Sequence, residues 1–167
     1  MELMSSNAVF RSEMQRLDVL ATPLVGQSIL ELLYDPNRSK GDRFDRLLLT
    51  HPSIYMVEVA LARTLISFGI VPDIVLGASL GTFAAAAIGG FLSVDDALVA
   101  LIGQARAVES NCVAGGMIAV LAAPEVFESS PIASLGAISA RSFDAHFIVS
   151  APAANMPAIE VELRRRC

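Results

Sequence analysis

The stretch DIVLGASLGTFAAAA, residues 73–87, sets a serine between two glycines, after an apolar run and before a row of alanines. The apolar run, residues 70–76, is predicted to form a buried strand, and the alanines a helix. A serine on a tight turn between a strand and a helix is typical of a nucleophile elbow, whose glycines let the backbone approach closely. The hydroxyl then projects at the N-terminus of the helix, where the backbone N–H of Leu80 can stabilise an oxyanion. The predicted elbow consists of Gly77, Ala78, Ser79 and Gly81.

A serine hydroxyl is a weak nucleophile unless a base activates it. The chain has two histidines. His51 precedes Pro52 at a predicted helix start, where a histidine commonly caps or packs, and His146 begins a predicted strand. Neither position indicates a base. Two interpretations therefore stay open: Ser79 is an activated nucleophile, or it lies on a tight turn and merely caps the following helix.

The chain before and after the predicted elbow is rich in helical patterns. Residues 7–34 are predicted to be helical with a break at Pro23. Residues 53–68 carry apolar side chains at the three-and-four spacing of one buried helix face, and Gly69 is a natural stop. Ser93 begins a further helix, which ends before Gly115-Gly116 and whose first turn holds two aspartates.

The last third of the chain changes in character. After a strand at residues 117–121, it is predicted to contain a short helix near 124–128, strands at 136–143 and 146–152, and a helix at 155–166. This order of elements is most of a ferredoxin-like subdomain without its final strand. Together with the strand, turn and helix around the serine, it indicates an α/β fold.

Composition excludes several classes of function. The 167 residues are 54% hydrophobic but 6% aromatic, which suits helices packed on a buried parallel sheet. No apolar run is long enough for a membrane span, and the N-terminus lacks a signal-peptide pattern, so a cytoplasmic protein without a membrane partner is expected. A net charge of −5 disfavours nucleic acid as a partner. Cys112 and Cys167 share no ligand spacing with the histidines, so neither a metal site nor a disulfide is expected.

Residues 50–98 resemble the acyltransferase family of polyketide and fatty-acid synthesis, which includes malonyl-CoA:acyl-carrier-protein transacylases and whose common motif is G-H-S-L-G-E. The segments GGMIAVL and IVSAP…AIEVEL also fit, so the resemblance covers nearly the whole chain. It implies an α/β-hydrolase-like domain, partial here over residues 1–122, and an incomplete ferredoxin-like subdomain over 123–167. It also implies ping-pong transfer of an acyl group through Ser79, with the Leu80 amide as one oxyanion donor and no cofactor.

The chain departs from the family pattern in several places. Ala78 stands where the family has the histidine before its serine, and Thr82 where it has a glutamate. The family's G-Q-G segment, which helps to build the oxyanion hole, has no counterpart. Its catalytic histidine follows the subdomain, beyond the position of Cys167. The resemblance therefore implies an interior portion of the family's domain, from which efficient turnover is not expected.

One departure bears on the substrate. Family members that use malonyl or methylmalonyl groups carry an arginine on the helix after the elbow, and Gln104 occupies that position here. A guanidinium meets a carboxylate with two charge-assisted hydrogen bonds, which an amide cannot do. Arg106 lies two residues further on, about 200° around the helix, so it is expected to face away. In this family such a change resembles the acyl hydrolases of trans-acyltransferase polyketide pathways. The alternative is a solvated Gln104 with Arg106 serving the substrate after a small shift.

Three functions follow from the sequence. The leading hypothesis is a serine-dependent enzyme of polyketide biosynthesis that removes neutral acyl groups from acyl carrier protein by hydrolysis, through an acyl-serine intermediate. The second is a malonyl-CoA:carrier-protein transacylase, for which CoA thioesters are also substrates. The third is a non-catalytic remnant that only binds a carrier protein.

Overall fold

The computed structural model describes residues 2–39, 41–42 and 44–167. The chain divides into two compact units, Met1–Asn111 and Cys112–Cys167. The sequence placed this boundary after residue 122. The structure places it earlier because strand β1 (Gly115–Val120) pairs with a later strand of the second unit.

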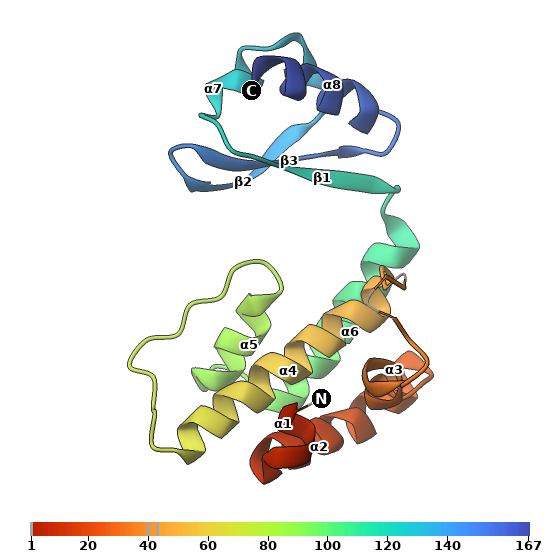
Figure 1. The fold of residues 1–167 in the computed structure, drawn as a ribbon, viewed down its shortest axis with the longest axis vertical. Coiled ribbons are helices and arrows are strands. Elements are labelled where there is room, and N and C mark those ends of the chain that lie inside the picture. The colour runs from red at the N-terminus through yellow and green to blue at the C-terminus, as the bar shows by residue number, and fades with distance from the viewer. Residues whose placement is uncertain (1, 40, 43) are drawn as a thin grey trace. The chain divides into compact units, whose positions relative to one another are not determined.

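The described residues of the first unit form helices without a strand (Figure 1). Helices α2, α4 and α6 pack against one another around a core that includes Met14, Leu17, Tyr55, Met56 and Leu98, all of them fully buried. The helices of this unit are α1 (Glu2–Ser6), α2 (Ala8–Val25), α3 (Ile29–Tyr34), α4 (Leu47–Ser67), α5 (Gly81–Ile88) and α6 (Val94–Asn111).

Helix α4 is longer than the sequence predicted, because it begins at Leu47 rather than at residue 53 and carries Pro52 in its interior. The Glu109 carboxylate on α6 accepts a hydrogen bond from the Leu48 N–H at 2.9 Å, which satisfies one of the free donors of the first turn. The predicted stop is confirmed: Gly69 has a φ of 83°, the left-handed conformation that glycine adopts most readily.

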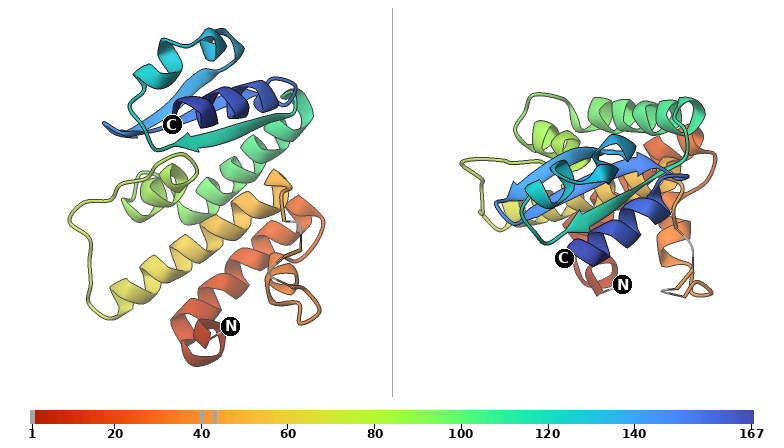
Figure 2. Two further views of the ribbon diagram at one scale, coloured as in Figure 1. Left: turned by 45° about the horizontal axis from the view of Figure 1, so that its top comes forward. Right: turned by 90° about the horizontal axis from the view of Figure 1, so that it is seen from above.

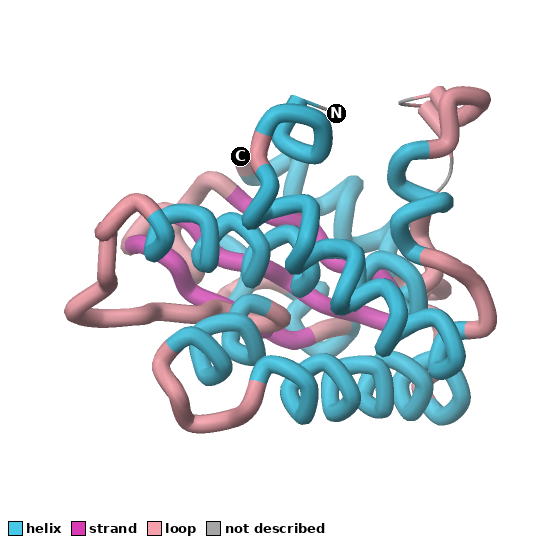
Figure 3. Tube along the Cα trace, turned by 90° about the horizontal axis from the view of Figure 1, so that it is seen from below, coloured by secondary structure: helices cyan, strands magenta, loops and turns pink. Residues whose placement is uncertain are grey.

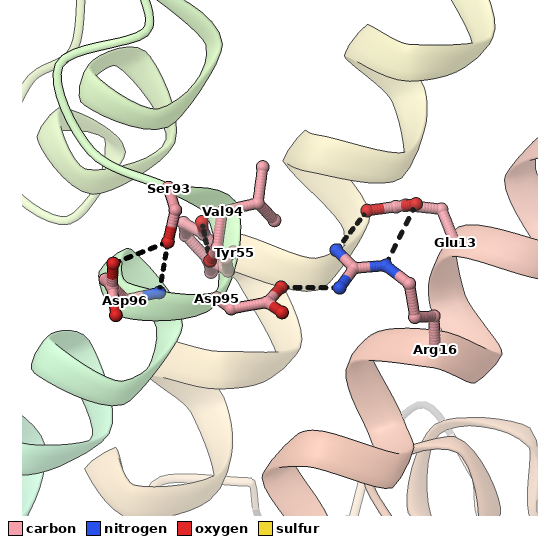
Figure 4. Close-up of polar contacts among 7 residues, drawn as sticks. All are labelled: Glu13, Arg16, Tyr55, Ser93, Val94, Asp95 and Asp96. Carbon is pink, nitrogen blue, oxygen red and sulfur yellow. Dashed lines mark hydrogen bonds and ion pairs between the residues drawn. The ribbon is translucent and has the colours of Figure 1, made fainter.

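Helix α6 begins as predicted. The Ser93 hydroxyl accepts a hydrogen bond from the Asp96 N–H at 3.0 Å and donates one to its carboxylate at 2.7 Å (Figure 4). Asp95 on the first turn pairs with Arg16 of α2, which also binds Glu13. The predicted buried face is confirmed in all its members, which are Ala97, Leu98, Leu101, Ile102 and Ala105.

The second unit is a three-stranded sheet with helices on one face (Figures 1 and 2). Its strand order is β1-β3-β2, and both pairings are antiparallel. The parallel sheet expected from the composition is therefore wrong for these strands, because β2 and β3 are joined by a two-residue turn that only an antiparallel pair accepts. The other elements are β2 (Ala137–Phe143), β3 (His146–Pro152), α7 (Glu125–Glu128), the 3₁₀ helix η1 (Pro131–Leu135) and α8 (Met156–Arg166).

The core of this unit follows the alternation along β3. Phe147, Val149 and Ala151 are buried, and they pack with Ile159 and Leu163 of α8. The run Arg164–Arg166 ends α8, and ion pairs with glutamates on the same helix hold all three arginines on an exposed face. The combination of helices with a sheet agrees with the α/β class.

The strand predicted at residues 70–76 is wrong. These residues form an extended loop between α4 and α5, and no strand lies in the described part of the first unit (Figure 3). Ile74 is 87% exposed and Leu76 is 95% exposed, so the segment is not buried either. A strand forms by hydrogen bonding to neighbours. The sequence pattern is that of a central strand, but the described residues of this unit supply no strand for it to pair with.

Candidate functional site

Ser79 lies on a strained turn that leads directly into α5. Its φ is 52°, and it is the single non-glycine residue with positive φ in the described part of the chain. The Gly81 N–H donates to the Ala78 carbonyl at 3.0 Å and the Thr82 N–H to the Ser79 carbonyl at 3.2 Å. A left-handed serine costs conformational energy and is uncommon outside functional or turn positions. The side chain of Ser79 is exposed.

The two glycines of the motif differ in their roles. A Cβ atom at Gly77 would lie 2.6 Å from the Thr82 Cα and closer still to the Gly81 carbonyl, and backbone atoms cannot move aside. Gly77 is therefore required by close approach, as the sequence analysis expected. A Cβ at Gly81 would meet only the Glu58 carboxylate, at an ordinary 3.7 Å. Crowding does not explain Gly81, so that part of the expectation is wrong.

The N–H groups of Gly81, Thr82 and Phe83 at the start of α5 donate to the carbonyls of Ala78, Ser79 and Leu80. Leu80 has helical geometry, with a φ of −55°, and immediately precedes Gly81. Among the described residues, no acceptor is hydrogen-bonded to the Leu80 N–H. The amide directly after the serine is thus available to a negatively charged oxygen, and the helix dipole of α5 favours such a charge.

An apolar groove of about 420 Å³ lies beside the serine turn, between α4, the loop of residues 70–78, and α5. Glu58 of α4 is the charged residue that lines it. Its Oε2 is buried without a hydrogen-bond partner among the described residues, and burial raises the pKa of this carboxyl. The sequence analysis missed Glu58. The sequence did contain a signal that could have identified Glu58: it is a single carboxylate, one turn before Ala62, within an otherwise apolar stretch of α4.

Neither histidine is placed as a base for Ser79. His51 lies seven residues before Glu58 on α4, about 10 Å along the helix axis. Its Nδ1 is buried without a partner, and burial lowers the pKa of the ring, opposed by the nearby Glu109. His146 lies in the second unit, where its ring is tilted by 32° against that of Phe143 with 6.1 Å between the ring centroids. In the part of the chain that the structure describes, no hydrogen bond joins either histidine to Ser79.

The two candidate substrate residues lie on the exposed surface of α6. Gln104 is exposed and forms no part of the groove lining. Arg106 donates a hydrogen bond to the Leu24 carbonyl of α2 at 2.5 Å. The guanidinium thus contacts α2, on the exposed surface. The described residues do not bring either side chain together with Ser79.

Other kinds of site find no support in the described residues. Among them, no group of three or more histidine, cysteine or acidic side chains is placed to hold a metal ion. Cys112 and Cys167 are exposed free thiols. The helices within residues 2–39, 41–42 and 44–167 include none that is both long and apolar enough to cross a membrane.

Comparison with known proteins assigns the chain to a family. Residues 1–134 match the family model "Acyl transferase domain". Two relatives are the polyketide biosynthesis acyltransferase homolog BaeD of Bacillus velezensis, 40% identical over 166 residues, and PksD of Bacillus subtilis, 36% identical. Each alignment covers 99% of this chain and 51% of the relative. The chain belongs to the acyl transferase domain family.

Solved structures give the same assignment. A loading acyltransferase from the avermectin modular polyketide synthase superposes with a TM-score of 0.87 at 27% identity, over 98% of this chain and 53% of that one. The acyltransferase domain from module 8 of the salinomycin polyketide synthase gives 0.84, also at 27% identity, over 98% of this chain and 39% of that one. The chain thus spans about half the length of the curated relatives that it matches.

Proposed function

We propose that this protein takes part in polyketide biosynthesis as a serine acyltransferase-family enzyme that removes neutral acyl groups from acyl carrier protein. The observation that carries the proposal is the left-handed, exposed Ser79 on a turn closed by Gly77 at the start of α5. The comparisons support the same proposal, because two relatives of this chain are named polyketide biosynthesis acyltransferase homologs.

The chemistry begins at the Ser79 hydroxyl. Its oxygen attacks the carbonyl carbon of a carrier-protein thioester, and the Leu80 N–H donates to the oxyanion that forms. The C–S bond then breaks, the carrier thiol leaves with a proton, and an acyl ester remains on Ser79. Water attacks this ester in the second step and releases a free acid. The proton acceptor is proposed to be a histidine in the half of the domain that this chain does not match, because His51 and His146 are placed elsewhere.

The preference for neutral acyl groups rests on the family resemblance rather than on the geometry of α6, where Gln104 is exposed and lies outside the groove lining. Family members that use malonyl groups carry an arginine at the position that Gln104 occupies here. An amide has no charge to pair with a malonyl carboxylate, whereas an acetyl or propionyl group needs no such partner. CoA thioesters of the same acyl groups are proposed as further acyl donors.

Two other functions make different predictions. A malonyl-CoA:carrier-protein transacylase needs Arg106 to leave α2 and to bind the malonyl carboxylate. A non-catalytic carrier-binding protein needs no acyl ester at all. The observation that favours it is that, among the described residues, no histidine is hydrogen-bonded to Ser79.

Intact-mass spectrometry tests the three functions together. The chain is incubated, together with the complementary half of the Bacillus velezensis relative, with acetyl, propionyl and malonyl thioesters of a carrier protein. Ser79→Ala is the test variant and Ser142→Ala, an exposed serine on β2, is the matched control. The proposal predicts a neutral acyl adduct that Ser79→Ala abolishes and Ser142→Ala retains. A malonyl adduct that passes to a carrier thiol would establish the transacylase. Carrier binding without any adduct would establish the non-catalytic protein.

A further inference from the structure

A carboxyl group on α4 lies directly against the serine turn. Glu58 lines the apolar groove together with Gly77, Ala78 and Gly81 of the turn. Its Oε1 is 3.7 Å from the point that a Cβ atom at Gly81 would occupy, and its Oε2 is buried without a hydrogen-bond partner among the described residues. Figure 1 shows α4 and α5 side by side, and Glu58 lies where α4 meets the first residue of α5. Among the described α4 residues that line the groove, Glu58 alone is polar.

Two energetically unfavourable features meet at this contact. Ser79 has a φ of 52°, a conformation that persists only where the surrounding structure imposes it. Burial of a carboxyl oxygen without a partner costs free energy that an apolar side chain of similar size would avoid. The packing of α5 on α4 does not require that cost, because the rest of the groove is lined by apolar residues and glycines. Their coincidence indicates that the carboxyl group supports the turn.

We propose that Glu58 is a positioning residue for Ser79, because it holds the first residue of α5 and, through that residue, the left-handed turn. The N-terminus of α5 carries a partial positive charge, which attracts a carboxyl oxygen. Gly81 has no side chain to separate the Glu58 oxygen from this helix end. The Gly81 N–H in turn donates to the Ala78 carbonyl at 3.0 Å, which closes the turn around Ser79. Glu58 thus acts on the serine through Gly81 and takes no part in the proposed bond changes.

This role also accounts for Gly81, which crowding does not explain. An alanine methyl group at this position would fit at 3.7 Å from the Glu58 Oε1, but it would lie between the carboxyl group and the backbone of the helix start. Glycine leaves that approach open. The inference rests on the proposed function in so far as Ser79 is the nucleophile, whereas the conformation of the turn can be measured without acyl transfer.

Glu58→Gln and Glu58→Leu form a matched pair of variants, because the two side chains are similar in size and differ in the polar oxygen. NMR of the full chain measures the intraresidue nuclear Overhauser effect between the N–H and Hα hydrogens of Ser79, which is strong at positive φ because the two hydrogens lie closest there. We expect a strong effect in the unmodified chain and in Glu58→Gln, and a weak one in Glu58→Leu. Val57→Ala removes a side chain of α4 that packs on the core outside the groove lining, and it should leave the effect strong.

A kinetic measurement connects the turn to the reaction. Acylation of Ser79 by a propionyl thioester of a carrier protein is followed by mass spectrometry, with the complementary half of the Bacillus velezensis relative present. Glu58→Leu is expected to lower the maximal acylation rate about 10- to 100-fold, as for a misplaced reacting group, and to leave the half-saturating thioester concentration unchanged. Glu58→Gln should stay within about threefold of the unmodified chain, because its amide oxygen replaces the carboxyl oxygen.

The inference is overturned if Ser79 keeps the strong Overhauser effect in Glu58→Leu. It is also overturned if Val57→Ala weakens the effect to the same extent, since general packing of α4 would then hold the turn. A maximal acylation rate in Glu58→Leu equal to that of the unmodified chain would contradict it as well. If the unmodified chain forms no acyl adduct at all, the proposed function fails instead, and the NMR comparison still decides the role of Glu58.

Discussion

Replacement of Ser79 by glycine is predicted to stabilise the first unit while it removes the proposed nucleophile. Serine at a φ of 52° holds its Cβ in the left-handed region, which costs an L-residue about 1–2 kcal/mol. Glycine avoids that cost but loses about 0.5–1 kcal/mol more backbone entropy on folding. The net gain for Ser79→Gly is therefore about 0.5–1 kcal/mol. Ser79→Ala keeps the Cβ and is expected to gain nothing.

Urea unfolding followed by the helical circular dichroism signal measures this difference. With a denaturant slope of about 1–2 kcal/mol per molar, the midpoint of Ser79→Gly should lie about 0.5 M above that of Ser79→Ala. The control is Ser12→Gly, on the exposed surface of α2, which should lose about 0.5 kcal/mol because glycine is the poorer helix former. The opposite signs of the two glycine variants are the diagnostic result. A Ser79→Gly midpoint at or below that of Ser79→Ala would refute the strained-turn geometry.

Three further predictions follow from contacts in the first unit. Gly77→Ala should lower the free energy of unfolding by about 3 kcal/mol in urea titrations and abolish acyl adducts in mass spectra, because its Cβ would overlap the Gly81 backbone. Tyr55→Phe should cost about 1–2 kcal/mol in the same titrations, since the Val94 carbonyl loses its buried 2.7 Å hydrogen bond. Burial raises the pKa of the Glu58 carboxyl above 4.5 in the folded chain, so this group loses its proton at a lower pH in the unfolded chain than in the folded one. The free energy of unfolding therefore falls as the pH rises beyond 4.5. Glu58→Gln should flatten this dependence, as unfolding curves between about pH 4.5 and 7 will reveal.

Sequence reasoning was accurate where local signals decide the structure. The glycine stop after α4, the serine cap of α6 and the buried face of α6 depend on residues close together in the chain. The hairpin of β2 and β3 and the closing helix α8 were located within one or two residues for the same reason. The start of α4 was placed six residues too late, because Pro52 was taken as a helix start rather than an interior residue.

The errors arose where distant parts of the chain decide the structure. A run such as residues 70–76 becomes a strand only with neighbours, and its sequence cannot specify whether they are present. The burial of Glu58 depends on the packing of α5 against α4, and no local sequence pattern predicts that contact. The contact between Arg106 and the Leu24 carbonyl joins residues that are 82 positions apart. Helical geometry predicted that Arg106 faces away from Gln104, but not what it binds.

The central claim is that Ser79 accepts an acyl group and passes it to water. The most direct measurement follows a propionyl thioester of a carrier protein in water enriched in heavy oxygen, with the complementary half of the relative present and Ser79→Ala as control. The account predicts a propionyl ester located on Ser79 by peptide mass spectrometry, followed by free propionic acid that carries one labelled oxygen. Acid released at the same rate by Ser79→Ala, or a propionyl group that moves to a second thiol without entering the acid pool, would contradict it.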